Sequence, residues 1–454
     1  MIAATATAVQ THPLTTLISR HSLTAAGYLK KVADRHEALG FGAMAHRKEK
    51  ATRWTREGVT PEKTALLAIA SLHGIDFADV DRYGWPGFLL LALDDDRTVL
   101  ESPWTAAGTV TTLTDVGGPV DRRGFLIAST STLAAAVAQW ITAEPAIAVG
   151  PGGRRVGAEA AGLFDIRLDA LRHLDDTVGA GRVYDAAVLE IRLITDLLKH
   201  SSYTEVTGRR LFASAAEASR LAGWCSYDEG RHAAAERHFV AALRACGSAQ
   251  DSTLGAVTLA FWANLRYNAD DPQGALHLLD GALADRRKIS SPRVTAMLHA
   301  RAARAHSKAG EATAAWRQID AAFTAYAKAD TPEADLPSMY WVNHGELHQV
   351  AASSALSLGE PKRALEDFTA ALTHEDPYDI DREARGTVIY QVRLAEAHLA
   401  LGNVDAALDL GHQVITVMGG IDSARSTSTL GELRGQLGGH RHIPAVADFL
   451  DYAA

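Results

Sequence analysis

The sequence predicts an all-α protein in which a small N-terminal bundle of helices precedes a long solenoid of helix pairs. Three observations support this fold class. A pattern of small residues recurs five times between Arg220 and Gly420, turn-forming residues interrupt each copy, and amphipathic segments occupy much of the remaining chain. We expect a bundle over residues 1–90, a linker or intermediate segment over 91–157, and the solenoid over 158–454.

The N-terminal part reads as four short helices, over residues 13–20, 25–39, 44–56 and 61–73. Pro13 and Pro61 suit the first turn of a helix, and the hydroxyl of Thr24 can cap the second helix. Residues 1–63 contain ten Lys/Arg and five Asp/Glu, whereas the whole chain has a net charge of −9. A basic segment on an acidic body indicates that a polyanion would bind to the small part only.

The third helix ends with Trp54 in its last turn, and Gly58, Pro61, Leu67-Ala68-Ile69-Ala70 and Gly74-Ile75 follow. This order resembles the repressor-type (Cro/Xre-like) helix-turn-helix family over about 60 residues. The sequence departs from the family at Ala25, where a glutamine is usual, and in its longer turn over 39–45. The resemblance implies that the helix over 44–56 reads double-stranded DNA.

Cationic and hydrogen-bonding side chains are concentrated on this helix. Cations bind phosphates, and forked donors read base edges when one helix projects both into the major groove. Lys50 and Arg53 are three residues apart and therefore share a helix face. The candidate DNA-binding residues are Arg47, Lys48, Lys50, Thr52, Arg53 and Arg56. The alternative is a solvated basic helix in a bundle that has lost DNA binding.

Residues 91–157 lack a clear pattern. The polar, Thr-containing stretch 94–119 predicts a short strand, a hairpin or a linker. Arg122-Arg123 opens a mildly apolar run to about residue 141, which we expect to form a buried or linker-adjacent helix. This run is too polar for a membrane span, and a twin-arginine pair in the interior of a chain is not an export signal. The Pro- and Gly-containing stretch 143–157 reads as a second linker.

The repeated pattern places a small residue and, twelve positions later, an alanine. The five pairs are Gly223/Ala235, Ala263/Ala275, Ala303/Ala315, Ala352/Ala364 and Ala395/Ala407. A third position follows seven residues on: Ala242, Ala282, Ala322, Ala371 and, less strictly, Val414. Each copy predicts two antiparallel helices that cross closely at the small residues, and a period of roughly 40 residues is in the range of helical repeat arrays.

The first copy reads Gly230, Ala235, Phe239, Ala242 and Leu243, which resembles the tetratricopeptide repeat. The resemblance implies a right-handed α-solenoid in which the first helix of each pair lines a concave groove. Helical segments over 163–174 and 184–198 precede the repeats, residues 330–337 form the longest break, and a capping helix over 444–452 ends the array.

The inward positions of the first helices carry side chains suited to peptide binding, because they can hydrogen-bond a backbone or enclose a side chain. These candidate groove residues are Arg220, Trp224, Asn264, Tyr267, Arg304, Gln349, Ser353 and Glu396. Each alone is more simply an exposed helical residue, so only the set predicts a groove.

We find no pattern for catalysis. His344 and His348 share a helix face, but Glu346 does not directly follow the first histidine as a zinc protease requires. We therefore expect no enzyme, no metal site and no cofactor. Cys225 and Cys246 give no disulfide framework and fit a reducing cytoplasm.

A helix-turn-helix followed by such repeats resembles a large group of bacterial, including actinobacterial, regulators, some of which bind peptides. The resemblance implies a cytoplasmic, homodimeric transcriptional regulator that binds double-stranded DNA and senses a peptide, small-molecule or protein ligand in the groove. The alternative is a protein-interaction scaffold whose helix-turn-helix no longer binds DNA. A basic helix facing solvent favours the regulator, and one buried against the repeats favours the scaffold.

Overall fold

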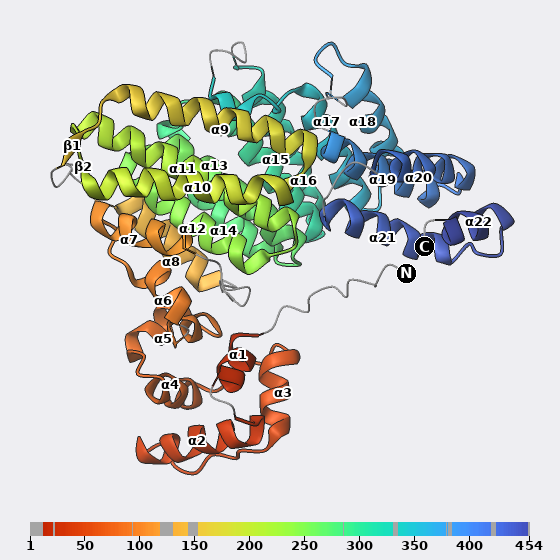
Figure 1. Cartoon of the computed structure of the whole chain (residues 1–454). Coiled ribbons are helices and arrows are strands. Elements are labelled where there is room, and N and C mark those ends of the chain that lie inside the picture. The colour runs from red at the N-terminus through yellow and green to blue at the C-terminus, as the bar shows by residue number, and fades with distance from the viewer. Residues whose placement is uncertain are drawn as a thin grey trace.

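The computed structural model describes residues 12–20, 23–92, 94–118, 130–143, 153–284, 286–329, 335–377, 379, 384–418 and 424–452. It confirms the predicted all-α solenoid, in which successive helix pairs stack side by side (Figure 1). Over these residues, none of the helices combines the length and apolarity that crossing a membrane requires.

Each of the five predicted repeats is one pair of helices. The pairs are α11 (Glu205–Asp228) with α12 (His232–Ala249), α13 (Ser252–Asn268) with α14 (Pro272–Ala284), α15 (Pro292–Lys308) with α16 (Ala312–Tyr326), α17 (His344–Ser357) with α18 (Pro361–Thr373), and α19 (Ala384–Ala400) with α20 (Val404–Met418). A further pair, α9 (Ala158–Val178) and α10 (Ala180–His200), precedes them. The helices α21 (Ala424–Gly438) and α22 (Pro444–Tyr452) follow, the latter as the predicted capping helix.

The small residues of the pattern lie where the paired helices cross. The nine alanines of the five small-residue pairs are all fully buried. A Cβ atom at Gly223, the tenth member, would come within 2.8 Å of the Phe239 ring. The fifth copy has Gly411 where the others have a large apolar residue, and a Cβ atom there would come within 2.7 Å of Phe449 in α22. The exception to the pattern therefore makes room for the capping helix.

The turns between paired helices use a left-handed backbone conformation. In four repeats a glycine adopts it, with φ between 74° and 80°: Gly230, Gly310, Gly359 and Gly402. The second repeat places Asp270 there instead, with φ of 59°. Glycine lacks the Cβ atom that makes this conformation costly, which explains why the turn signal recurs at the same place in the pattern.

The structure contradicts the prediction of a strand, hairpin or linker for residues 94–118. They form α6 (Asp94–Glu101) and α7 (Ala106–Val116), and α8 (Thr130–Thr142) follows as the expected helix. Helix α7 packs against α10 and α12, and α8 packs against α14. The buried Arg244 of α12 donates hydrogen bonds to the backbone oxygens of Ser102 (2.5 Å) and Leu100 (3.0 Å). This part of the chain is a helical layer on the outer face of the repeats.

The stretch 143–157, predicted as a second linker, is described only in part. Residues 144–152 lie outside the described residues. The strand β1 (Arg154–Arg155) pairs in parallel with β2 (Ser201–Ser202), which follows α10. This short pairing joins the entry and exit of the α9–α10 pair.

The N-terminal bundle contains α1 (Pro13–Arg20), α2 (Ala25–Ala38), α3 (Lys48–Arg56), α4 (Lys63–Leu72), α5 (Phe77–Tyr83) and the 3₁₀ helix η1 (Gly87–Ala92). The Thr24 hydroxyl caps α2, as predicted, by accepting a hydrogen bond from the amide of Gly27 (3.1 Å). Helix α3 begins four residues later than predicted, since residues 42–47 adopt no regular structure. Figure 1 shows the bundle beside the repeat layer, joined to it through α5 and α6.

Candidate functional site

The inner face of the repeat array encloses a cavity of about 1350 Å³. Its walls come from the first helix of every pair, α9, α11, α13, α15, α17 and α19, and from α21. A volume this large exceeds the roughly 300–1,000 Å³ of ordinary small-molecule pockets. The cavity is therefore large enough for a ligand the size of a short peptide or a nucleotide.

The structure brings six of the eight predicted groove residues to this cavity: Arg220, Trp224, Asn264, Tyr267, Arg304 and Ser353. Gln349 and Glu396 do not line it, although both are buried on the same set of helices. Glu396 instead accepts a hydrogen bond from Gln436 (3.0 Å), which joins α19 to α21. Binding of a ligand by the six lining residues stays a prediction.

Aromatic side chains form a continuous wall on one side of the cavity. The rings of Trp224 and Phe261 meet edge to face with centroids 5.1 Å apart, and Phe261 meets Trp341 in the same way at 6.1 Å. The guanidinium of Arg220 lies over Phe261, 4.5 Å from its centroid, and pairs with Glu217 at 2.9 Å. Such a wall offers apolar surface and π faces to a ligand.

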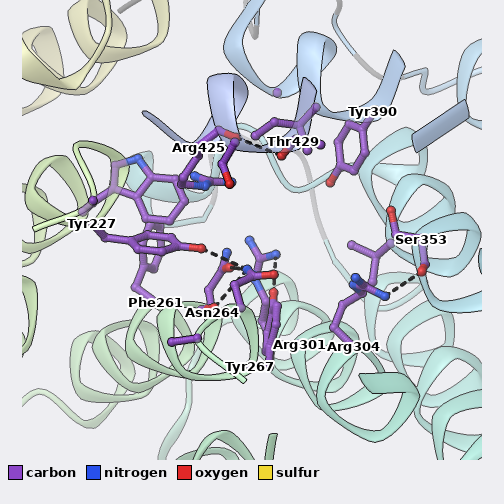
Figure 2. Close-up of a pocket in the computed structure, with 18 of the residues that line it drawn as sticks. Tyr227, Phe261, Asn264, Tyr267, Arg301, Arg304, Ser353, Tyr390, Arg425 and Thr429 are labelled. Atoms are coloured by element: carbon purple, nitrogen blue, oxygen red, sulfur yellow. Dashed lines mark hydrogen bonds between the residues drawn. The ribbon is translucent and has the colours of Figure 1, made fainter. Parts of the chain in front are cut away.

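Helix α15 contributes three cations to the cavity: Arg301, Arg304 and Lys308. They are spaced by three and four residues and therefore share one face of the helix. Arg304 is only 7% exposed and donates to the carbonyl oxygen of Ser353 on α17 (2.6 Å). Figure 2 shows the guanidinium groups of Arg301 and Arg304 pointing into the space between the helices.

A buried carboxyl lies on the neighbouring helix α17, near enough to Arg301 for the two charges to interact. Glu346 of α17 is 6% exposed, and both of its oxygens are 2.9 Å from the hydroxyl of Tyr390. Burial raises the pKa of the Glu346 carboxyl to about 7, although Arg301 and the hydrogen bond from Tyr390 act to lower it. Near neutral pH this carboxyl consequently carries only part of a negative charge.

Helix α21 closes the array by reaching back to the first repeat. The guanidinium of Arg425 lies 4.7 Å from the centroid of Trp224 and 5.0 Å from that of Tyr227. It also pairs with the fully buried Asp228 at 3.5 Å, across 197 residues of sequence. We call these contacts the Arg425 latch.

Several cavity residues were not predicted from the sequence. Arg301 precedes the predicted Arg304 by three positions on the same helix face, so extending the inward positions by one turn finds it. Tyr390 lies six residues before Glu396 on α19, a spacing that places it on a different helix face, so the inward positions do not find it. Arg425 and Trp341 have no comparable signal, because they lie outside the repeated pattern and reach the cavity through the curvature of the whole array.

The second candidate site is the surface of α3. Five of the six predicted DNA-binding residues are exposed: Arg47, Lys48, Thr52, Arg53 and Arg56. The sixth, Lys50, is half-buried, with its Nζ atom 5.4 Å from the ring centroid of Trp54. Among the residues that the structure describes, none of the five cations forms an ion pair. The surface is thus predominantly positive, with Glu49 as the acidic residue of the helix.

The core beneath α3 explains why this face is presented outward. Trp54 is 3% exposed and meets Trp85 edge to face, with centroids 6.2 Å apart. The long turn between α2 and α3 is held to α2, because the ring of His36 is within hydrogen-bonding distance of the carbonyl oxygen of Gly42 (2.8 Å). Burial of Ala51 and Trp54 on one side of α3 leaves Lys48, Arg53 and Arg56 exposed.

The two histidines of α17 contact different side chains. His344 stacks on His374 with ring centroids 4.2 Å apart, while the Nδ1 atom of His348 lies 3.0 Å from a carboxylate oxygen of Asp367. Across the described ranges, no group of three His, Cys, Asp or Glu side chains is arranged to hold a metal ion. Cys225 and Cys246 form no disulfide and are buried in α11 and α12, where packing accounts for them.

Comparison with known proteins adds little to this geometry. No protein-family model matches the chain, and no curated protein matches it significantly. Among solved structures, the chain is similar to one from the APC/C hetero-tetramer Cut9-Hcn1, with 13% identity and a TM-score of 0.33. The match covers 92% of this chain and 69% of that chain. At such a distance, the helix pairs themselves rather than the similarity identify the chain as an all-α repeat protein.

Proposed function

We propose that the protein is a DNA-binding transcriptional regulator whose repeat domain senses a ligand. The observation that carries the proposal is the cationic surface of α3 and its N-cap, where five cations form no ion pair with any residue that the structure describes. Cations gathered on one short helix repel one another, and a polyanion relieves this repulsion while releasing its own counterions. A solvent-facing basic helix favours the regulator over the scaffold.

The bundle around α3 has parts in the order that a helix-turn-helix requires. Helix α2 packs against α3 and α4, so the module presents α3 from a common core. A recognition helix places its side chains in the major groove while the preceding helix crosses the backbone. Arg53 and Arg56 can supply forked donors for base edges or phosphates, and Lys48 a point charge for phosphate.

The cavity of the repeat domain supports the sensing half of the proposal. It is lined by helices from every repeat, so a ligand inside it contacts the whole array at once. A ligand that binds one curvature of the array more tightly shifts the population toward that curvature. In a cytoplasmic homodimer, this shift would change the spacing of two copies of α3, to which half-site recognition is sensitive.

The proposal is tested by selecting bound fragments from a random pool of double-stranded DNA. We expect an enriched motif with the wild-type protein, and loss of that motif with Lys50→Ala/Arg53→Ala. Removing a base-reading arginine costs about 1–3 kcal/mol, so affinity for the motif should fall about 5- to 150-fold. A motif with two-fold symmetry would additionally support the homodimer.

The matched control is Lys30→Ala/Lys31→Ala, which removes two exposed charges from α2 of the same bundle. The control should retain the motif, because general attraction to phosphate carries no sequence information. Failure to enrich any motif with folded protein, with and without cell extract as a source of ligand, would contradict the regulator and favour the scaffold. Binding that lacks a salt dependence would contradict it equally.

A further inference from the structure

Among the residues that the structure describes, the three cations of α15 form no direct ion pair. In the described part of the chain, no carboxylate lies within ion-pair distance of Arg301, Arg304 or Lys308. Most other arginines around the cavity have such partners: Arg220 pairs with Glu217, and Arg425 with Asp228. Glu346 of α17 acts on Arg301 through space, so Arg304 is the cation of α15 with the least compensation from nearby carboxylates.

Structural roles use only part of the hydrogen-bonding capacity of these side chains. Through Nη1, Arg304 donates to the carbonyl oxygen of Ser353 and lies 3.1 Å from the hydroxyl oxygens of Ser307 and Ser357. Arg301 donates through Nη1 to the hydroxyl of Tyr267 at 3.2 Å. A guanidinium has five N–H donors, so each arginine retains donors beyond these contacts.

Leaving a cation buried without a counter-charge is energetically costly. Burial lowers the pKa of the Arg304 guanidinium to about 10, and the neighbouring Arg393 and Arg301 act in the same direction. Arg393 itself is neutralised by Glu396 at 2.9 Å and Glu432 at 3.3 Å. A bound anion would remove the cost of burying Arg304, because it supplies the missing charge and accepts the remaining N–H donors.

The charged face adjoins the aromatic wall. Arg301 lies over the ring of Trp341, 5.5 Å from its centroid, and Trp341 continues through Phe261 to Trp224. A molecule whose anionic end meets α15 would therefore place its adjacent atoms against π faces. Pockets of this kind hold the apolar body by burial and set its orientation with a few polar groups.

We propose that the cavity binds an anionic ligand with an aromatic or apolar body, whose carboxylate or phosphate is held by Arg301, Arg304 and Lys308. This inference rests on the proposed ligand-sensing role of the repeat domain and assigns its ligand a chemical class. Planar guanidinium groups bind both kinds of oxyanion through paired hydrogen bonds. Carboxylate and phosphate ligands share this chemistry, and the test separates them.

The test compares probe pairs that differ in one charged group. N-acetyltryptophan and its amide form the carboxylate arm, while adenosine monophosphate and adenosine form the phosphate arm. Binding of each to the full chain is measured by titration calorimetry at low and moderate salt, without DNA. We expect the anionic member of at least one pair to bind about tenfold more tightly than its neutral partner. The arm that shows this preference identifies the oxyanion.

Arg301→Gln/Arg304→Gln should abolish the preference for the anion. The matched control is Arg317→Gln, which removes an exposed arginine from α16, the partner helix of the same repeat, and should leave the preference unchanged. Because Arg304 also joins α15 to α17, two milder variants accompany the double variant. Arg301→Gln alone should weaken the preference, and Arg304→Lys, which keeps the charge, should retain most of it.

Three results would overturn the inference: equal binding of charged and neutral probes, a preference that survives in the folded double variant, or no binding of either anion at millimolar concentration. These outcomes are separable from failure of the regulator itself. If a DNA motif is selected but neither anion binds, only this inference is contradicted. Anion binding without any DNA motif preserves it and favours a ligand-binding scaffold.

Discussion

At the scale of single residues, Glu346 is the titratable group whose environment most affects stability near neutral pH. Its pKa rises from 4.5 to about 7 because burial disfavours the charged carboxylate. A carboxyl with a raised pKa holds its proton in the folded chain at a pH where the unfolded chain has released it. Its contribution to stability is therefore present below pH 4.5 and is lost as the pH rises to about 7.

Replacing Glu346 with glutamine should remove this dependence, because the amide oxygen still accepts from Tyr390 but does not ionise. Relative to wild type, Glu346→Gln should gain about 3 kcal/mol in the free energy of unfolding between pH 4.5 and pH 7.5. Urea unfolding of both proteins at a series of pH values measures the difference.

The comparison with the variant is needed because buried histidines act in the opposite direction. Burial lowers the pKa of His238 to about 3 and that of His12 to about 4, so their contribution to stability is lost on acidification. Both proteins share that trend, and subtracting the two curves isolates Glu346. Parallel curves would show that Glu346 is ionised in the folded chain over the whole range.

At the scale of elements, α8 docks on the repeats where two helices have glycines. A Cβ atom on Gly281 of α14 would overlap the side chain of Val137, and one on Gly255 of α13 would overlap the ring of Trp140. Both contacts belong to α8, which packs on α14. The close approach of helical backbones allowed by glycine thus fixes the position of the outer helical layer.

Gly281→Ala should destabilise the protein, although alanine is the better helix former. Overpacking a fitted contact costs about 1–3 kcal/mol, which exceeds the gain of up to about 1 kcal/mol in helix propensity. Gly435→Ala is the matched control, since a Cβ atom at this position in α21 meets nothing within 4 Å. Chemical unfolding should show a loss for Gly281→Ala and a small gain for Gly435→Ala. Equal changes in the two variants would contradict the docking role of Gly281.

Elements are predictable from sequence where the same packing problem recurs. The repeat helices were predictable because five copies place an alanine or glycine at every close crossing, so chance matches are improbable. Helix α7 was not, because Thr109 and Thr112 give it the composition of a strand. Its helical state depends on burial against α10 and α12, where Thr109 lies 2.9 Å from the hydroxyl of Ser248.

The cavity was predictable to the same extent as the repeats. Inward positions of a first helix follow from the pattern, and they located residues such as Arg220 and Tyr267. The prediction that Gln349 lines the cavity was wrong, because a residue on the inner helix can face a neighbouring helix instead of the open space. Arg425 and Trp341 depend on the curvature of the complete array, which is a sum over many crossing angles and has no local signal.

At the scale of the whole molecule, the Arg425 latch joins the last helices to the first repeat. Arg425→Ala should weaken this closure, because it removes the cation from two aromatic rings and leaves the buried Asp228 without one of its partners. Hydrogen–deuterium exchange should show roughly tenfold lower protection in α21 and α22, with little change in α13 and α14.

Arg434→Ala serves as the control for the latch, since it removes an arginine from the same helix for which the described residues offer no ion pair. Small-angle scattering should record a larger radius of gyration for Arg425→Ala than for Arg434→Ala. Unchanged protection and unchanged dimensions in Arg425→Ala would show that other contacts of α21 suffice to hold the array closed.

The distance along the chain between the two halves of the latch has a consequence during synthesis. Asp228 leaves the ribosome 197 residues before Arg425, an interval of roughly 10–40 s at a bacterial or eukaryotic elongation rate of about 5–20 residues per second. Throughout that interval the early repeats can fold on their neighbours while the inner face stays open. A ligand present in the cell at that time would meet its binding surface before the last helices cover it, and would become enclosed as translation ends.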